Sequence, residues 1–514
     1  VTEFNMPKRK QPLALRHIAT QKATIMLTGV LGTWTERLCL AADGGIQDYQ
    51  QAVQYVQQQG TLMHGLLTLF PTEVLEDLSP TVIRSLVDDI AACDEDNWGF
   101  KPTSWDGEDM YNAVCTNMVK SVVVPSVTRC DMKGLTSGFA QKLIIKALNS
   151  AYNLTHLAFD TATDTDNSGL LAKIIDDLTN LQSFQYKYQC TDIVIQELGL
   201  RCKRLTQLDI SYSQEVTDFS IYHLLKLKRL TDINLMETSI SPEFYGRLIS
   251  RLKNISILNS SPPICEILST VSTEKLYTIT CVTAPIHNTN ILTQKCPRIT
   301  TLTLNSVYED LSSLTALNNL DELHLDEGDY VTSNMAAVLQ GVGHRLNELD
   351  LRKIYNVNMA DTVTLCSRLD VLVLECCTFV PLAKHTFLSS DLPHYKTVDL
   401  FLYIHQTPEN EEYNRHLRYY VNLTAFMCAG VHIVTDDFVA DAIHNGAFRY
   451  IVNFEVEDAE DGDLSMTTVE LLLEHCEHLE TLGYLQSWRR LTPQNISDLK
   501  DRILLQNLNL GIVL

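Results

Sequence analysis

Apolar residues recur with the same spacing along most of this 514-residue chain. Leu205, Leu208 and Ile210 are followed 25 residues later by Leu230 and its two equivalents. The clearest copies are LTQLDI, LTDINL, ITTLTL, LDELHL, LNELDL and LDVLVL. We assign sixteen starts of this pattern, at Val119, Leu154, Leu181, Leu205, Leu230, Ile255, Leu276, Ile299, Leu320, Leu346, Leu369, Tyr395, Leu423, Ile451, Leu479 and Leu505. From Leu154 to Leu505 the starts span 351 residues in 14 intervals, a mean period near 25.

Each unit of the pattern combines two periodicities. LDELHL alternates apolar and polar residues, which predicts a short strand, whereas TDFSIYHLLKLK and PEFYGRLISRLK have helical spacing. One such unit cannot bury its own apolar face, so neighbouring units stack, and the wider helices impose curvature. The period lies within the roughly 20 to 29 residues of leucine-rich repeats. The pattern therefore predicts an α/β fold: a curved leucine-rich-repeat solenoid, or horseshoe, with a parallel concave sheet and convex helices, over residues 116–514 in about sixteen units.

The chain ahead of the repeats has a different pattern. Residues 12–98 have apolar residues at helical spacing and predict an α-helical N-terminal segment, in which Ser79 is expected to cap a helix that begins at Pro80. Glycine, proline and serine gather after it, so residues 99–115 are expected to form a linker or loop. Residues 1–5 are expected to derive from cloning, with Met6 as the native start.

Composition narrows the classes of partner. With 40 basic and 63 acidic side chains the net charge is -23, which disfavours nucleic acid and anionic membranes and favours a basic protein. No apolar run is long enough to span a bilayer. The 14 cysteines show neither zinc spacing nor a disulfide framework, which indicates a cytoplasmic or nuclear compartment.

The strands carry many acidic residues on one side. Period two places the second, fourth and sixth residues after each start on the concave face. Lys187 and Arg352 are the bases at these positions, and the acids are Asp160, Asp209, Asp232, Glu322, Asp326, Glu348, Asp350, Glu375, Asp399, Glu455 and Glu457. Those from Glu322 to Glu375 are expected to form one patch whose carboxylates repel one another. The face is either an acidic trough that selects a basic partner or a solvated surface of an acidic protein.

Motifs for catalysis are missing from the sequence. DTDNSG at 164–169 matches the first half of an EF-hand loop, but Ile175 stands where a bidentate carboxylate is required. His475 and His478 precede a strand and indicate a helix end rather than a metal site. With no phosphate-binding glycine loop, nucleophile elbow or zinc helix, the sequence predicts a non-enzymatic protein without metal or cofactor.

Cysteines recur beside the predicted strands, at Cys202, Cys296, Cys366 and Cys476. With the repeat, they make the chain resemble the cysteine-containing leucine-rich-repeat proteins, which include the F-box/leucine-rich-repeat substrate receptors. The resemblance covers roughly residues 119–514. It implies that the curved inner face holds a protein partner, and that the cysteines are small buried hydrophobes.

The segment LFPTEVLEDL, residues 69–78, resembles the opening of an F-box and equally the cullin-binding half of a VHL box. In the VHL alternative, TERLCLAA at 35–42 is the elongin-binding segment. The chain departs from both families: Phe70 stands where an F-box prefers leucine, and no cysteine-x-x-tryptophan follows. The resemblance implies adaptor-binding residues Phe70, Pro71, Val74, Leu75 and Leu78.

Two functions follow from these resemblances. The chain is either a substrate-recognition subunit of a cullin-type ubiquitin ligase, attached through a Skp-type or elongin-type adaptor, or a stand-alone binding or inhibitory solenoid. In the second case the N-terminal helices only cap the first repeat, whose apolar surface would otherwise be exposed.

Overall fold

The computed structural model describes residues 15–95, 108–272, 276–380, 399–403, 423–429, 434–444, 448–457 and 463–513. The predicted fold class, an α/β leucine-rich-repeat solenoid preceded by an α-helical segment, is confirmed. The chain divides into two compact units. The first unit comprises Leu13–Pro262 with Ser269–Ser272, and the second comprises Pro263–Leu268 with Thr273–Leu514.

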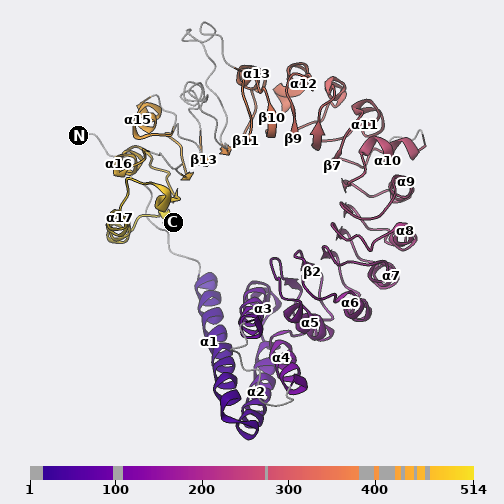
Figure 1. Ribbon diagram of the computed structural model, residues 1–514, viewed down its shortest axis with the longest axis vertical. Helices are drawn as coiled ribbons and strands as arrows, with labels where there is room; N and C mark the ends of the chain where they lie inside the picture. Colours follow the sequence, from indigo (N-terminus) through magenta and orange to yellow (C-terminus); the bar gives the residue numbers. More distant parts are fainter. Residues whose placement is uncertain are drawn as a thin grey trace. The chain divides into compact units, whose positions relative to one another are not determined.

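The first unit begins with four helices, α1 (Leu15–Gly44), α2 (Ile46–Leu67), α3 (Thr72–Glu95) and α4 (Glu108–Val122). Helix α1 packs on α2 and α3, and α2 packs on α4 (Figure 1). Trp34, Tyr49 and Leu86 are among the buried side chains between them. Helix α3 also packs against the first repeat, through α5 and β1. The helical segment therefore has a core of its own and covers one end of the repeats.

Two boundaries in this segment differ from the prediction. The loop expected at 99–115 is partly helical, because α4 begins at Glu108 and buries Tyr111, Val114 and Cys115 at helical spacing. The break expected at Ser79 is also wrong. Pro80 lies inside the continuous helix α3, where burial of the surrounding apolar residues outweighs the hydrogen bond that proline cannot donate.

The repeats of the first unit pair their strands in sequence order, and every pair is parallel. Leu157, Phe184, Leu208, Ile233 and Leu258 are in register and buried, so they form one continuous layer under the sheet. The elements are β1 (Arg129–Asp131), α5 (Gly138–Ala147), β2 (His156–Phe159), α6 (Ser168–Ile174), β3 (Ser183–Tyr186), α7 (Asp192–Arg201), β4 (Gln207–Asp209), α8 (Asp218–Leu224), β5 (Asp232–Asn234), α9 (Pro242–Arg251) and β6 (Ile257–Asn259).

The second unit repeats the arrangement, with strands on one side and helices on the other (Figure 1). Its strands are β7 (Cys281–Pro285), β8 (Thr301–Val307), β9 (Glu322–Asp329), β10 (Glu348–Tyr355), β11 (Val371–Glu375), β12 (Asp399–Tyr403), β13 (Ala425–Ala429), β14 (Asn453–Glu457), β15 (Thr481–Gly483) and β16 (Gly511–Ile512). Its helices are α10 (Ile264–Thr270), α11 (Thr289–Lys295), α12 (Met335–Val342), α13 (Met359–Leu365), α15 (Asp436–His444), α16 (Met466–His475) and α17 (Pro493–Gln506). Single 3-10 turns complete several repeats in the two units, at η1 (Leu148–Ser150), η2 (Ile175–Asp177), η3 (Ser312–Ala316), η4 (Gly343–Arg345) and η5 (Leu485–Ser487).

Most of the predicted pattern starts precede a strand by two residues, from Leu154 and β2 to Leu479 and β15. Three are wrong. Val119 lies in α4, Leu276 precedes β7 by five residues, and Leu505 is an 87% exposed residue of α17. Tyr395 lies outside the described residues.

Aspartates link the helices of neighbouring repeats. The Asp192 carboxylate, in the first turn of α7, accepts hydrogen bonds from the backbone N–H of Thr217 at 2.9 Å and from the Ser220 hydroxyl at 2.5 Å. Thr217 is the N-cap of α8. Asp218 likewise accepts from the N–H of Ser241, the N-cap of α9, and Asp436 accepts from that of Ser465, the N-cap of α16. These three interhelix aspartates satisfy donors that a helix start leaves unpaired.

The recurrent cysteines are structural. Cys202, Cys296, Cys366 and Cys476 are buried, as expected. The thiols of Cys202 and Cys476 donate to the carbonyls of Leu178 and Phe448, in the preceding repeat. Burial raises the pKa of the Cys202 thiol to about 12, so it stays protonated and unreactive.

Candidate protein-binding surfaces

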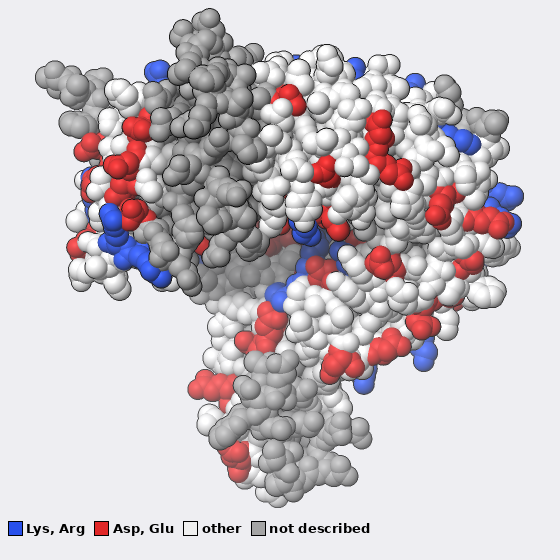
Figure 2. All heavy atoms as spheres, turned by 45° about the horizontal axis from the view of Figure 1, so that its top comes forward, with Lys and Arg blue, Asp and Glu red and all other residues white. Residues whose placement is uncertain are grey.

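The side of each sheet opposite the helices, here called the strand face, presents alternate side chains to solvent. The predicted acids stand at these positions, including Asp209, Asp232, Glu322 and Glu455. Figure 2 shows one view of the molecular surface without singling out the strand face, and on it acidic side chains lie in small groups among uncharged ones. The binding of a partner by these acids is still a prediction.

In the second unit, strands β9 to β11 bring acids and bases together. His324 of β9 lies among three carboxylates, with Nδ1 3.4 Å from Asp350 Oδ2 and 3.8 Å from Glu348 Oε1, and Nε2 4.0 Å from Glu322 Oε2. Arg352 donates from Nη2 to Asp350 Oδ2 at 2.9 Å, and its Nη1 lies 3.3 Å from Glu375 Oε2. We call Glu322, His324, Glu348, Asp350, Arg352 and Glu375 the His324 cluster.

The charges in the His324 cluster stabilise one another. Burial of Asp350 opposes its ionisation, but hydrogen bonds from His324 and Arg352 outweigh that effect and hold the pKa of Asp350 below its usual range. The hydrogen bond with Asp350 raises the pKa of His324 despite partial burial, and Glu348 and Glu322 act in the same direction. Burial is the main reason that the pKa of Glu348 is raised.

The expected repulsion between acids is therefore outweighed at Asp350, although Glu322 and Asp350 still raise the pKa of Glu348 beside its burial. Asp350 is buried rather than exposed and has two cationic partners. Lys353 also approaches Asp326, with Nζ 3.8 Å from Oδ1. The sequence comparison counted acids only against Lys and Arg at alternate strand positions, so it missed His324, which pairs in register with Asp350. It also missed Lys353, because a left-handed φ of 50° takes this residue out of the strand alternation.

The raised pKa of His324 predicts a pH dependence of stability. A folded pKa above the unfolded value of about 6.5 gives stability that is fully present below that value and lost as pH rises through the folded pKa. We expect the thermal midpoint to fall as pH rises above about 6.5, and to fall less in His324→Gln. Thermal melts between pH 6 and 9 measure this, with the exposed His344→Gln as control. Identical pH profiles of wild type and His324→Gln would contradict the assignment.

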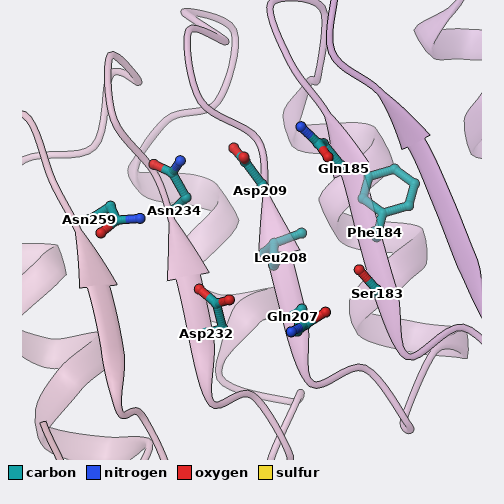
Figure 3. A pocket seen from close by; sticks show the side chains of 9 residues that line it. All are labelled: Ser183, Phe184, Gln185, Gln207, Leu208, Asp209, Asp232, Asn234 and Asn259. Carbon is teal, nitrogen blue, oxygen red and sulfur yellow. The ribbon is translucent and has the colours of Figure 1, made fainter. Parts of the chain in front are cut away.

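In the first unit, strands β3 to β6 form a polar groove on the strand face, with a volume of about 220 Å³. Figure 3 shows Gln185, Asp209, Asn234 and Asn259 in one row across the strands and Ser183, Gln207 and Asp232 in a second. Phe184 and Leu208 complete the lining. We call this set the amide groove. Beyond the carboxyl-terminal ends of β3 and β4, Tyr188 and Tyr212 stack with ring centroids 5.0 Å apart. The sequence reasoning found Asp209 and Asp232 but not the amides around them.

The predicted adaptor-binding residues differ in burial within the helical segment. Leu75 and Leu78 are 1% exposed and belong to its core, so their prediction as adaptor contacts is wrong. Phe70 and Pro71 are exposed, and Val74 is half-buried. In the predicted elongin-binding segment, Leu38 is also fully buried.

A second apolar surface lies at the end of α2 and includes the first two residues of the LFPTEVLEDL segment. Leu62, Leu66 and Leu69 are 62%, 60% and 81% exposed, and Phe70 follows them. The leucines are four and three residues apart and so share one side of the chain as α2 ends. We call Leu62, Leu66, Leu69 and Phe70 the α2 ridge. Its helical spacing is present in the sequence, but spacing alone does not tell a packed stripe from an exposed one.

Two features are absent from the part of the chain that the structure describes. There, no group of three or more His, Cys, Asp or Glu side chains is arranged to hold a metal ion. Nor does this part contain a helix long and apolar enough to cross a membrane.

The fold defines the class of protein: a leucine-rich-repeat solenoid, an architecture whose extended strand face binds other proteins. No protein-family model and no curated protein matches the chain. Similar solved structures include an internalin from Listeria monocytogenes, with 14% identity, 77% of this chain and 88% of that chain covered, and a TM-score of 0.33. The complex of Rad7 and Elc1 in yeast matches with 11% identity, 96% and 91% coverage and a TM-score of 0.40. A leucine-rich-repeat protein of Leptospira interrogans matches with 13% identity, 77% and 92% coverage and a TM-score of 0.31.

Proposed function

We propose that this protein is a substrate-recognition subunit of a cullin-type ubiquitin ligase, in which the strand face binds a protein and the N-terminal helices bind an adaptor. The observation that carries the proposal is the α2 ridge, an exposed apolar surface on the helical segment. The thiols of Cys202, Cys296 and Cys476, which form no disulfide, agree with action in the cytoplasm or nucleus, where thiols stay reduced.

A helical cap alone does not require the α2 ridge. The packed side of α2 is formed by other residues, among them Tyr49, Val53, Val56 and Met63. Single exposed leucines are common on protein surfaces, but a group of large apolar side chains within two turns is typical of a docking site. Spacing of three and four residues suits a partner that packs side chains of its own against a helix.

The proposal predicts the outcome of adaptor capture by the full chain. Leu66→Lys with Leu69→Lys should reduce capture of a Skp-type or elongin-type adaptor at least about tenfold, because two central apolar contacts are replaced by charges. Both leucines are exposed, so the variant should keep the wild-type thermal midpoint. Titration of the purified chain with each adaptor measures the affinity.

Gln50→Lys with Gln57→Lys is a matched control, since it adds two charges to exposed polar positions on another side of the same helix. The control should bind the adaptor as wild type does. Full capture by the folded Leu66→Lys, Leu69→Lys variant would exclude the α2 ridge as the adaptor site. If the wild-type chain captures neither adaptor, the ligase proposal is wrong.

The second candidate is a stand-alone binding or inhibitory solenoid. The burial of Leu75 and Leu78, together with the packing of α3 against α5 and β1, supports a capping role for these helices. Under this alternative the strand face still binds a protein, but the α2 ridge has no adaptor.

A further inference from the structure

We infer that the stacked pair Tyr188 and Tyr212, with Glu237 of the next repeat, binds an arginine side chain of the partner protein. The inference rests on the proposed protein-binding function and names one contact that the partner supplies. It is carried by two exposed, stacked rings that have no cation of the chain beside them, and by an exposed carboxylate next to the stack.

The three residues occupy equivalent places in successive repeats, just beyond β3, β4 and β5. The N–H of Tyr188 donates to the carbonyl of Ser211 at 3.0 Å, and the N–H of Tyr212 donates to the carbonyl of Met236 at 2.8 Å. Glu237 follows Met236 and has a positive φ of 53°, like the two tyrosines. The three side chains therefore belong to one row, along the edge where the strands end.

The two tyrosines are exposed in a backbone conformation that does not favour them. Their φ values are 70° and 62°, in the left-handed region where glycine and asparagine are usual. The rings stack 13° from parallel with centroids 5.0 Å apart, which stabilises the pair. Both side chains nevertheless remain 42% and 44% exposed, so packing into the core does not account for them.

One ring face of the pair is open to a cation. Tyr188 covers one face of the Tyr212 ring, and because the stack follows the order of the repeats, the other face is on the side of Glu237. Among the described residues, no lysine or arginine lies over either ring. Several other exposed tyrosines do have such a cation, namely Tyr55 with Arg37, Tyr222 with Lys226, Tyr277 with Arg298 and Tyr450 with Arg449.

The charges around the pair suit an incoming cation. Glu237 is exposed, and its Oε1 accepts a hydrogen bond from the Ser261 hydroxyl at 3.0 Å, which holds the carboxylate in the row. No ion pair involves Glu237 in the part of the chain that the structure describes. Lys187 precedes Tyr188 but pairs with Asp209, with Nζ 3.5 Å from Oδ2. A cation of the partner would therefore meet an aromatic face and an unpaired carboxylate.

A guanidinium group fits this pair of contacts better than an ammonium group. It is planar, so it can stack on the Tyr212 ring while its N–H donors point sideways to the Glu237 carboxylate. An ammonium is a compact, strongly hydrated point charge and gives up more hydration on an aromatic face. The two contacts come from neighbouring strands, which are about 4.8 Å apart, within the reach of one arginine side chain.

Peptide binding to the full chain tests the inference. The probes are Gly-Ser-Arg-Ser-Gly and the same peptide with lysine or with citrulline, the uncharged analogue of arginine. Ligand-observed NMR titration at low salt measures the affinities. The arginine peptide should bind about fivefold more tightly than the citrulline peptide, and more tightly than the lysine peptide. Equal binding of arginine and citrulline, or of arginine and lysine, would overturn the inference.

Tyr212→Ala tests the ring and should reduce arginine-peptide affinity about fivefold. Tyr212→Phe keeps the aromatic face and should restore most of that affinity. Tyr222→Ala is a matched control, since it removes an exposed tyrosine of α8 that already has Lys226 over its ring. Unchanged affinity in folded Tyr212→Ala, or no recovery in folded Tyr212→Phe, would contradict the site.

Glu237→Gln tests the carboxylate without changing either ring, and it should lower arginine-peptide affinity about threefold. Its matched control is Glu243→Gln, which removes one negative charge from the exposed surface of α9 in the same unit. The same affinity in Glu237→Gln as in wild type would rule out the carboxylate contact and with it the proposed site. Peptide binding without adaptor capture would exclude only the ligase attachment, whereas adaptor capture without peptide binding would exclude only the arginine site.

Discussion

Replacing Leu208 with Asp is expected to lower the free energy of unfolding of the first unit by at least about 3 kcal/mol. Leu208 is 1% exposed and lies in the middle of the in-register layer between Phe184 and Ile233. The substitution removes a packed side chain and leaves a carboxylate without a partner in an apolar layer. Urea unfolding followed by circular dichroism measures the change. Leu349 occupies the same place in β10 of the second unit and should respond similarly.

Gln207→Asp is the control for this experiment. Gln207 precedes Leu208 in β4 but is exposed on the strand face, so the same charge should change the stability by less than about 1 kcal/mol. Equal effects at the two positions would mean that the alternation of buried and exposed residues in β4 is misassigned.

Trp488→Ala is expected to cost the second unit about 4 kcal/mol. Trp488 is fully buried, and its ring meets Phe454 edge-on with centroids 6.4 Å apart. Its indole N–H donates to the carbonyl of Val456 at 2.8 Å. Alanine would leave a large cavity and a buried carbonyl without its donor. The midpoint of urea unfolding, followed by far-ultraviolet circular dichroism, reports the loss.

Trp488→Phe separates the two contributions to this loss. Phenylalanine fills most of the cavity but cannot donate to Val456, so it should cost about 1 to 2 kcal/mol. A loss as large as that of Trp488→Ala would assign the whole effect to the hydrogen bond. A negligible loss of stability in both variants would show that the surrounding side chains close the cavity without a cost in free energy of unfolding.

The repeat was predictable because the same spacing of apolar residues recurs in many successive repeats. The strands that begin two residues after Leu205, Leu320 and Leu479 follow from spacing alone. Two of the three misplaced starts, Val119 and Leu505, are apolar residues of helices whose spacing resembles the strand pattern locally. A short apolar run is compatible with both structures, and packing decides between them.

The candidate sites were less predictable, because they depend on contacts between neighbouring repeats and neighbouring helices. Period two placed Asp209 and Glu348 on the strand face, but the pairing of Asp350 with His324 and Arg352 depends on strand register and side-chain reach. In the helical segment, Leu75 and Leu66 have similar local patterns, yet one is buried and the other exposed. Which stripe of an amphipathic helix meets the core depends on where its neighbours pack.

The interhelix aspartates have a consequence for how the solenoid unfolds. Asp192 and Asp218 each hold the first turn of the next helix, so the chain from α7 to α9 is joined by two successive links. If one repeat opened alone, either its aspartate or the N–H groups at the start of the next helix would lose their hydrogen-bond partners. Neighbouring repeats therefore share the cost of opening, and the region from α7 to α9 should behave as one cooperative folding element. The two central strands of the amide groove, β4 and β5, lie within that element, so their groove side chains keep their spacing through fluctuations that open a single repeat elsewhere.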